Sequence, residues 1–247
     1  MRIAVAGGTG TVGSKVVDAV RARGHEVVVL TRSAGVNVVT GEGLDAALTG
    51  VDALVDTANI ATLKRDAAVA FFEASSLALL AAEARAGVAH HVALSIVGID
   101  GSASGYYAGK LAQERVVAQG ELPWTILRAT QFHEFAAQIY ARAKIGPLHL
   151  APRMRTQPIA AGEVAERLAL IAEGEPAGRV PDLAGPREES LVEMVRAWAK
   201  ASGHRGWIPA VSLPGGAGRE QRDGSLLPRP GAMLGRETFA DWLARRP

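Results

Sequence analysis

The stretch Val5-Ala6-Gly7-Gly8-Thr9-Gly10-Thr11-Val12-Gly13 decides the fold. Residues 2–5 read as a buried strand, and residues 14–24 read as a helix that stops at a glycine. Glycines at positions 7, 10 and 13 allow a tight turn and a close approach of the backbone to a pyrophosphate, whose charge meets the free N–H groups of the helix N-terminus. The stretch therefore predicts the first half of a βαβ unit that binds a dinucleotide.

A phosphate-binding P-loop is a competing interpretation, because Gly8 and Gly13 have the spacing of that motif. The P-loop needs a lysine directly after its last glycine, followed by Ser or Thr. Here the order is reversed, with Ser14 before Lys15. We therefore reject the P-loop.

The end of the second expected strand, residues 25–30, distinguishes between nicotinamide cofactors. NAD-binding units carry an acidic residue about 20 positions after the glycine loop, where it bonds the ribose 2′-hydroxyl. Here the strand runs into Thr31-Arg32-Ser33. A guanidinium flanked by hydroxyls suits a 2′-phosphate, which favours NADP(H). The alternative is a surface arginine at a strand end.

The rest of the chain alternates apolar strands with helices. Strands are expected at 37–40, 52–58, 91–96 and 124–128. Helices are expected at 44–48, 106–119 and 131–143, and a further long helix is expected to end at residue 85. Beyond them we expect strands at 157–160 and 179–183, helices at 162–173, 188–201 and 237–245, and a loop at 212–235. Near-continuous Val, Leu and Ile in the strands indicates a parallel sheet covered on both faces.

The predicted fold is α/β, a Rossmann-type doubly wound parallel sheet with a small C-terminal substrate lobe. We place the NADP(H)-binding Rossmann core at residues 1–145. A small mixed α/β lobe would follow at residues 146–247, packed on the core, and one continuous domain is the alternative.

Composition excludes several classes of protein. The 247 residues carry a net charge of +2 with scattered arginines, which gives no argument for nucleic acid. There is no cysteine, hence no disulfide or thiolate chemistry, and we expect a cytoplasmic protein. The most apolar segment, residues 67–86, is interrupted by Glu73, Glu83 and Arg85, so no membrane span is expected. His90 and His91 have no acidic partner in the neighbouring sequence, so no metal site is expected.

Tyr106 and Lys110 are four residues apart on an expected helix and share a face. A lysine ammonium beside a phenol lowers the phenol pKa, so the tyrosine can exchange a proton with a carbonyl or alcohol oxygen. Ser95, at the end of the preceding strand, would orient that oxygen. Tyr107 could take the same role, and the alternative is a packed tyrosine with a solvated lysine. His133-Glu134 is a weaker acid–base candidate.

In these motifs the chain resembles an atypical short-chain dehydrogenase/reductase, of the branch with NmrA-like proteins and NADPH-dependent quinone reductases. The resemblance rests on the glycine stretch, Thr31-Arg32-Ser33, Leu94-Ser95, Tyr106-Tyr107-x-x-Lys110, Leu127-Arg128-Ala129-Thr130-Gln131-Phe132 and Thr238-Phe239-x-x-Trp242-Leu243. It departs from the family where the sixth strand ends Leu-Arg-Ala, since Leu-Arg-Pro is frequent there.

The resemblance implies that NADP(H) lies across the carboxyl ends of the strands. The implied contacts are Gly7, Thr9, Gly10, Thr11, Val12 and Gly13 at the pyrophosphate, Arg32 and Ser33 at the 2′-phosphate, Ala58 and Asn59 at the adenosine half, Ser95 and Lys110 at the nicotinamide ribose, and Ala129, Thr130 and Phe132 near the ring.

The implied function is hydride transfer between NADP(H) and a small carbonyl or quinone, with Ser95, Tyr106 and Lys110 as the catalytic residues. The alternative is a non-catalytic NADP(H)-binding regulator of the NmrA type. A nucleotide-sugar epimerase with bound NAD is a third possibility, and Arg32 and the short C-terminal lobe argue against it. We expect a small-molecule substrate and a monomer or weak homodimer.

Overall fold

The computed structural model describes residues 1–102 and 104–245, which form two compact units. Unit 1 consists of Met1–Ile96, Ser104–Arg128 and Gly162–Pro181. Unit 2 consists of Val97–Ala103, Ala129–Ala161 and Asp182–Pro247. The two units therefore interleave along the chain, whereas the sequence suggested one division between residues 145 and 146.

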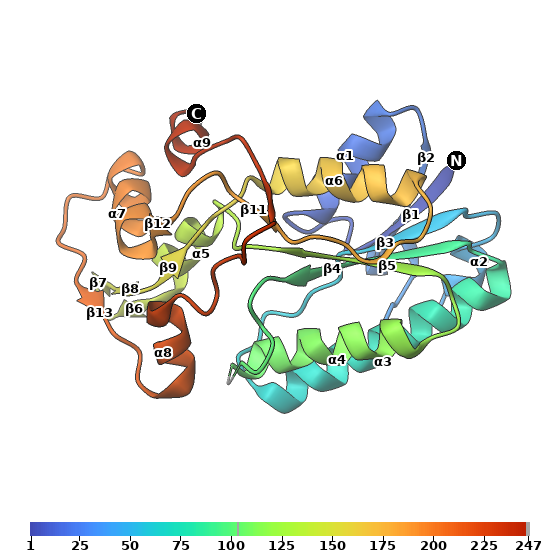
Figure 1. Ribbon diagram of the computed structural model, residues 1–247, viewed down its shortest axis with the longest axis horizontal. Coiled ribbons are helices and arrows are strands. Elements are labelled where there is room, and N and C mark those ends of the chain that lie inside the picture. Colours follow the sequence, from blue (N-terminus) through green and yellow to red (C-terminus); the bar gives the residue numbers. More distant parts are fainter. Residues whose placement is uncertain (103, 246–247) are drawn as a thin grey trace. The chain divides into compact units, whose positions relative to one another are not determined.

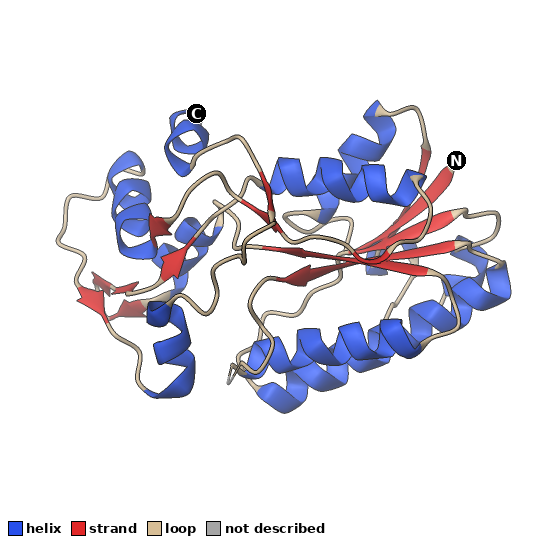
Figure 2. Ribbon diagram, in the orientation of Figure 1, coloured by secondary structure: helices blue, strands red, loops and turns tan. Residues whose placement is uncertain are grey.

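Unit 1 is built on a parallel sheet (Figure 2). Its main strands are β1 (Arg2–Ala6), β2 (Glu26–Leu30), β3 (Ala53–Asp56), β4 (His90–Ile96) and β5 (Trp124–Ala129), in the order β5-β4-β3-β1-β2, and β10 (Gly178–Arg179) pairs with β5. The pairs β1–β2, β1–β3 and β3–β4 are all parallel. Because β2 and β3 lie on opposite sides of β1, the carboxyl end of β1 is the topological switch point, where such sheets bind ligands.

Helices cover both faces of this sheet. They are α1 (Gly13–Ala22), α2 (Leu44–Ala47), α3 (Arg65–Ala86), α4 (Gly105–Gln119) and α6 (Ala161–Glu173). Helices α3 and α4 lie on one face, and α1 and α6 lie on the other (Figure 1). A sheet of buried parallel strands requires this double cover. The predicted Rossmann-type α/β fold class is confirmed.

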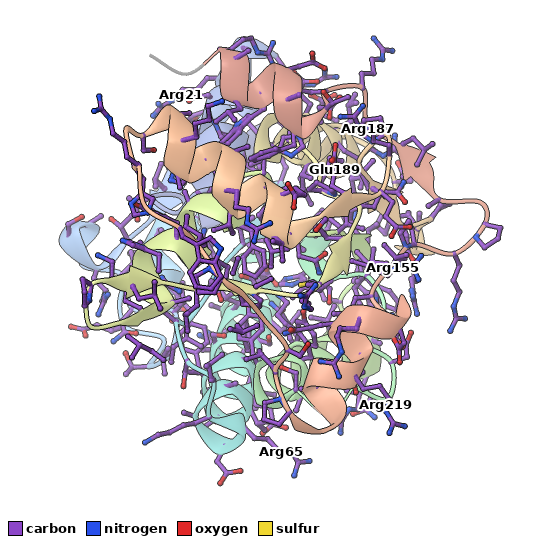
Figure 3. All side chains as sticks on the ribbon, turned by 90° about the vertical axis from the view of Figure 1, so that its left-hand side faces the viewer. Arg21, Arg65, Arg155, Arg187, Glu189 and Arg219 are labelled. Atoms are coloured by element: carbon purple, nitrogen blue, oxygen red, sulfur yellow. The ribbon has the colours of Figure 1, made fainter. Side chains whose placement is uncertain are left out.

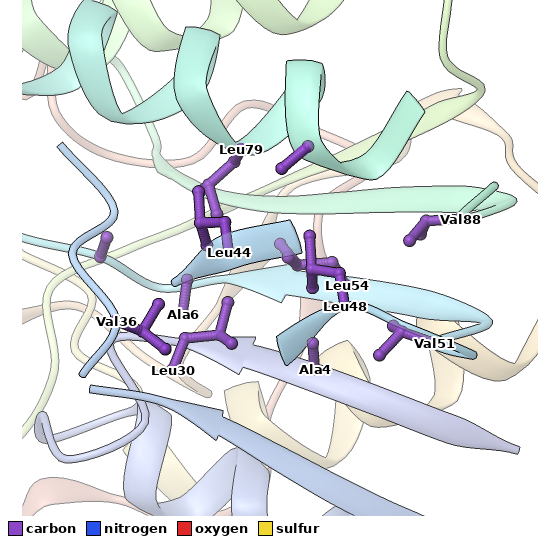
Figure 4. Close-up of a cluster of buried hydrophobic side chains, with 12 residues drawn as sticks. Ala4, Ala6, Leu30, Val36, Leu44, Leu48, Val51, Leu54, Leu79 and Val88 are labelled. Atoms are coloured by element: carbon purple, nitrogen blue, oxygen red, sulfur yellow. The ribbon is translucent and has the colours of Figure 1, made fainter. Parts of the chain in front are cut away.

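A cluster of apolar side chains joins the sheet to α2 and α3 (Figure 4). Leu54 of β3, Leu44 of α2 and Leu79 of α3 are each fully buried within it. Burying a leucine side chain stabilises a fold by about 1.5–3 kcal/mol. The cluster anchors the short α2 and the long α3 against the strands whose ends form the site.

The strand expected at residues 37–40 is wrong. Residues 38–40 form a turn in which the Asn37 Oδ1 accepts a hydrogen bond of 3.0 Å from the Val39 backbone N–H. Asparagine side chains favour such turns by bonding their own backbone. The two valines raised the strand propensity of the stretch, but the Asn37 side chain determines the local structure.

Helix α3 is long and apolar enough, by length and composition, to cross a membrane, and this makes it the one candidate span among the described residues. The core helices of soluble proteins pass the same test. In unit 1, α3 buries Phe72, Leu79 and Ala82. It ends where Gly87 adopts a left-handed φ of 72°, as the sequence predicted.

Unit 2 combines short strands with four helices among its described residues. The strands are β6 (Lys144–Ile145), β7 (Leu148–His149), β8 (Ala151–Pro152), β9 (Arg155–Thr156), β11 (Leu183–Ala184), β12 (Glu189–Ser190), β13 (Ala210–Val211) and β14 (Met233–Leu234). The helices are α5 (Phe135–Arg142), α7 (Leu191–Ala201), α8 (Gly215–Asp223) and α9 (Phe239–Ala244).

Three predictions for this part of the chain are wrong. The strand expected at residues 157–160 is reduced to a single bridge at Ile159. The helix expected from residue 131 begins only at Phe135, because Phe132 forms an isolated β-bridge with Ile159. The expected loop at residues 212–235 contains α8 and β14. Helix α8 was not predicted because three of its nine residues are glycines, which have a low helix propensity.

Candidate functional site

The glycine loop of unit 1 packs backbone against backbone. A Cβ atom on Gly13 would lie 2.1 Å from the Gly7 carbonyl oxygen, and one on Gly7 would lie 2.6 Å from the Thr57 carbonyl oxygen. Gly7 also has a left-handed φ of 72°. Only glycine fits at either position without a shift of the backbone. The loop after β1 is therefore held directly against the segment that follows β3.

The tip of this loop is open to solvent. Thr9, Gly10 and Thr11 are exposed. Within the described chain, the backbone N–H groups of Thr9, Thr11 and Val12 have no hydrogen-bond acceptor. Helix α1 starts immediately afterwards with no side-chain cap and no acidic residue in its first turn. Unpaired N–H groups at a helix N-terminus bind phosphate, so the loop fits a dinucleotide pyrophosphate.

Arg32 follows β2 at the same carboxyl edge of the sheet. Thr31 accepts a hydrogen bond of 3.2 Å from the Ala34 N–H and caps the short 3-10 turn η1 (Arg32–Ala34). The Arg32 side chain is exposed and has no hydrogen bond or ion pair to any described residue. A guanidinium that no carboxylate engages is available for a phosphate.

Ala58 and Asn59 also belong to this edge. The Ala58 N–H donates to the Asp56 carboxylate over 2.9 Å, and the Thr57 hydroxyl donates to the Ala6 carbonyl oxygen over 2.7 Å. These bonds tie the end of β3 to the end of β1, where the glycine loop begins. The Ala58 backbone therefore lies beside Gly7 of the loop, and Asn59 follows it in the chain.

Ser95 lies near the end of β4 with 2% of its surface exposed. Its hydroxyl is buried and has no hydrogen-bond partner among the described residues. An unpaired buried hydroxyl costs about 1–3 kcal/mol, and a bound water, ion or ligand would offset this cost. The serine can therefore still donate a hydrogen bond to a bound molecule.

Tyr106 at the start of α4 is bonded differently from the prediction. Its hydroxyl donates to the Asn59 Oδ1 over 2.8 Å, and its ring packs edge-on against Phe72. Burial raises the pKa of Tyr106 to about 12; the neighbouring Tyr107 adds to the shift, and the Asn59 hydrogen bond opposes it. The expectation that Lys110 lowers this pKa is wrong in direction, because the ammonium group is engaged elsewhere.

Lys110 is buried inside unit 1. Its Nζ donates to the Leu94 carbonyl oxygen over 2.6 Å and to the Gln113 side-chain oxygen. Gln113 in turn donates to the Asp56 carboxylate over 2.7 Å. Burial lowers the pKa of Lys110 to about 8, against the opposing effect of Asp56 and Glu114. The lysine is therefore fixed by protein groups, and two of its three N–H donors are used.

Sequence reasoning missed Asp56 and Gln113. The available signal was an acidic residue inside an apolar strand, since a buried carboxylate needs partners. Gln113 stands three residues after Lys110 on one helix face, a spacing that also predicts contact.

The structure gives His91 an acidic partner that its neighbouring sequence did not indicate. Its Nδ1 lies 2.9 Å from a carboxylate oxygen of Glu83, and both side chains are fully buried. Burial alone would lower the pKa of His91, but the charge and hydrogen bond of Glu83 raise it above its ordinary value. The pair is structural in position, between α3 and β4. No group of three or more potential metal ligands gathers within residues 1–102 and 104–245.

The remaining predicted residues lie in unit 2. Ala129 and Thr130 are buried, and the Thr130 hydroxyl donates to the Gln157 carbonyl oxygen over 2.6 Å. Phe132 is half-buried. His133 is fully buried against the rings of Phe239 and Trp242, a position typical of a packed core histidine.

An NAD(P)H-binding family model matches residues 7–169, so the chain belongs to that family. No curated protein matches its sequence.

Solved structures share the fold over nearly the whole chain. MoeE5 in complex with UDP-glucose and NAD has a TM-score of 0.74 at 19% identity, over 99% of this chain and 96% of that one. A UDP-glucose 4-epimerase of Thermus thermophilus with NAD has a TM-score of 0.69 at 22% identity, over 99% and 92%. The NADPH-dependent quinone oxidoreductase QOR2 of Escherichia coli with NADPH has a TM-score of 0.70 at 17% identity, over 98% of each chain.

These structures share the Rossmann-type fold that the resemblance implies. They include an epimerase that binds NAD and a quinone oxidoreductase that binds NADPH. The family match establishes NAD(P)H binding as the property of the chain.

Proposed function

We propose that the protein is an NADP(H)-dependent oxidoreductase that reduces a small carbonyl or quinone substrate. The observation that carries the choice of cofactor is Arg32. Its side chain is exposed and unengaged directly after β2, where an NAD-binding unit would carry a carboxylate. Thr31 and Ser33 add hydroxyl groups at the same turn, and their oxygen atoms lie 3.1 Å apart.

Residues of β4 and α4 would handle the proton of the reaction. The bound cofactor supplies the hydride. Tyr106 is protonated at neutral pH, as an ordinary tyrosine is, and in this form it can donate a proton to a reduced carbonyl oxygen. The unpaired Ser95 hydroxyl would orient that oxygen, and the third N–H of Lys110 would bond the ribose.

The test of the cofactor assignment compares NADPH and NADH binding by calorimetry. We expect the wild type to prefer NADPH, and Arg32→Ala to lose about tenfold or more in NADPH affinity with little change for NADH. Arg21→Ala, which removes an equally exposed arginine from α1, is the matched control. Equal affinity of the wild type for both cofactors would reject the 2′-phosphate assignment.

The test of the chemistry is NADPH oxidation across a panel of quinones and small ketones. Ser95→Ala and Tyr106→Phe should each lower kcat/KM for ketones by about 100-fold, the usual contribution of general acid catalysis. If ketone turnover is unchanged in both variants, the assigned roles are wrong.

A non-catalytic NADP(H)-binding regulator is the second candidate. The observation in its favour is that Tyr106 is bonded to Asn59, and Lys110 to Leu94 and Gln113, with no hydrogen bond between the two residues. This alternative predicts tight NADPH binding without turnover of any substrate in the panel.

A further inference from the structure

Unit 2 contains a cavity of about 590 Å³ with an unusual density of arginine side chains. Four of them line it: Arg153, Arg155, Arg196 and Arg222. Three glutamates, Glu188, Glu189 and Glu193, line it as well. The volume lies within the range of small-molecule sites, roughly 300–1,000 Å³.

The cavity forms where several short elements meet. Strands β9 and β12 pair in antiparallel register, with Ser190 opposite Arg155. The Arg153 N–H donates to the Val211 carbonyl oxygen over 2.8 Å, and the Leu191 N–H donates to the Met154 carbonyl oxygen over 3.0 Å. These backbone bonds fix the positions from which the arginine side chains extend.

Each glutamate already has a guanidinium partner. Glu188 binds Arg155 through two hydrogen bonds of 2.7 and 3.0 Å. Glu193 lies 3.2 Å from Arg196. Glu189 lies 2.7 Å from Arg187, which does not line the cavity, and Figure 3 labels this pair beside Arg155.

Two arginines remain without a carboxylate. The Arg222 guanidinium donates one hydrogen bond of 2.8 Å to the Leu213 carbonyl oxygen, and the Arg153 side chain has no hydrogen bond or ion pair to any described residue. Asp223 lies near enough to affect Arg155, but its own oxygen accepts from Ser225. The cavity wall thus offers two unneutralised cationic forks, the geometry that binds carboxylate or phosphate.

Two further features of the cavity indicate what kind of ligand it would bind. Helix α7 begins at the cavity-lining Ser190, which makes no side-chain cap; the Leu191 N–H is bonded to the Met154 carbonyl oxygen, and the positive end of the helix dipole adds to the positive field. The buried side chains of Met154 and Val192 give the wall an apolar part. A bare inorganic ion would leave that apolar surface unused, whereas an organic molecule with an anionic group would cover it.

We infer that this cavity of unit 2 binds a small organic anion, whose phosphate or carboxylate group lies between Arg153 and Arg222. The inference does not depend on the proposed oxidoreductase function, because each residue that carries it lies in unit 2.

The experiment is titration calorimetry on the full chain saturated with NADPH, so that the glycine loop is occupied. The probes are an aromatic phosphate monoester and the matching aromatic carboxylate, which separate the two anionic groups, with the neutral parent alcohol as reference. We expect saturable binding of at least one anion, and loss of roughly tenfold or more in affinity in Arg153→Gln and in Arg222→Gln.

The matched control is Arg219→Gln. Arg219 lies on α8 one turn before Arg222 but does not line the cavity, and Figure 3 labels it on that helix. The control should keep the wild-type affinity. Absence of saturable binding by both anions, equal binding of the neutral alcohol, or an equal loss in Arg219→Gln would overturn the inference.

Failure of this experiment is distinguishable from failure of the proposed function. NADPH affinity, measured in the first step on the same variants, should be unchanged by substitutions in the cavity. If Arg153→Gln weakens NADPH itself, the cationic group serves the cofactor and the separate anion site is rejected.

Discussion

The glycine loop and the buried polar layer of unit 1 are stabilised by opposite means. In the loop, backbone touches backbone and there is no room for a side chain at Gly7 or Gly13. In the polar layer, which we define as Asp56, Glu83, His91, Lys110 and Gln113, buried side chains bind one another and two neighbouring backbone groups. Adding a side chain at Gly7 or Gly13 therefore destabilises the loop. Removing one partner of a buried ion destabilises the polar layer, because the other charge is left uncompensated.

The largest expected effect is that of Gly13→Ala. Its Cβ would meet the Gly7 carbonyl oxygen at 2.1 Å, so backbone must move in the centre of the loop. We expect the free energy of unfolding to fall by about 4 kcal/mol or more, with loss of NADPH binding. Urea denaturation followed by circular dichroism measures the first effect.

The control for this prediction is Gly162→Ala on α6, where an added Cβ meets nothing within 4 Å. Alanine is the better helix former, so this variant should be as stable as the wild type or slightly more stable. Equal stability of the two variants would show that the close approach in the loop is not a determinant of the fold.

The next largest effect tests the polar layer at its most buried pair. Glu83→Gln removes the charge opposite His91, and we expect a loss of about 3 kcal/mol in the free energy of unfolding at pH 6. Glu73→Gln, on the exposed side of the same helix, should change stability by less than about 0.5 kcal/mol.

The pH dependence of this effect has a definite sign. The pKa of His91 is raised in the folded state, so its ion pair contributes stability below pH 6.5 that is lost as the pH rises through the folded pKa. The difference between wild type and Glu83→Gln should therefore shrink toward alkaline pH. A difference that does not vary with pH would mean that His91 is neutral throughout.

Lys110 gives a smaller effect of opposite sign. Its pKa falls from 10.5 to about 8 on folding, so between these values the unfolded state binds more protons. Stability from this group therefore rises with pH from about 8 to 10, by at most about 1.4 kcal/mol per pH unit.

Lys110→Met should abolish this rise, and Lys15→Met, an exposed lysine on α1, should keep it. Thermal unfolding of the three proteins at pH 8, 9 and 10 makes the comparison. A wild-type curve parallel to that of Lys110→Met would show that the lysine stays charged in the folded state up to pH 10.

The two regions also differ in what could be predicted from the chain alone. The glycine loop was predictable because its determinants, Gly7, Gly10 and Gly13, are local and follow a strand directly. The same holds for Arg32, which follows the next strand. The raised pKa of Tyr106 was not predictable, because it comes first from burial of the side chain, which packs against Phe72, and then from the neighbouring Tyr107.

Non-local contacts explain the other errors as well. Glu83 and His91 are eight residues apart, but they meet only because the chain reverses after α3 and enters β4. Phe132 leaves its expected helix because it bridges to Ile159. The cationic cavity of unit 2 combines residues from four short segments between 153 and 222, and none of these segments carries a motif.

The smallest expected effect concerns the hydrogen bond from the Tyr106 hydroxyl to the Asn59 side chain. Asn59 follows the strand end beside the glycine loop, and Tyr106 lies on the same helix as Lys110 of the polar layer. Removing one hydrogen bond usually costs about 0.5–1.5 kcal/mol, so Tyr106→Phe and Asn59→Ala should each destabilise by about 1 kcal/mol. If the 2.8 Å bond accounts for both losses, the double variant should lose no more than about 1 kcal/mol as well. Additive losses would indicate two independent packing effects. They would also show that the hydrogen bond between Tyr106 and Asn59 contributes no stability. The Tyr106 hydroxyl could then leave Asn59 and bind a substrate without destabilising the fold.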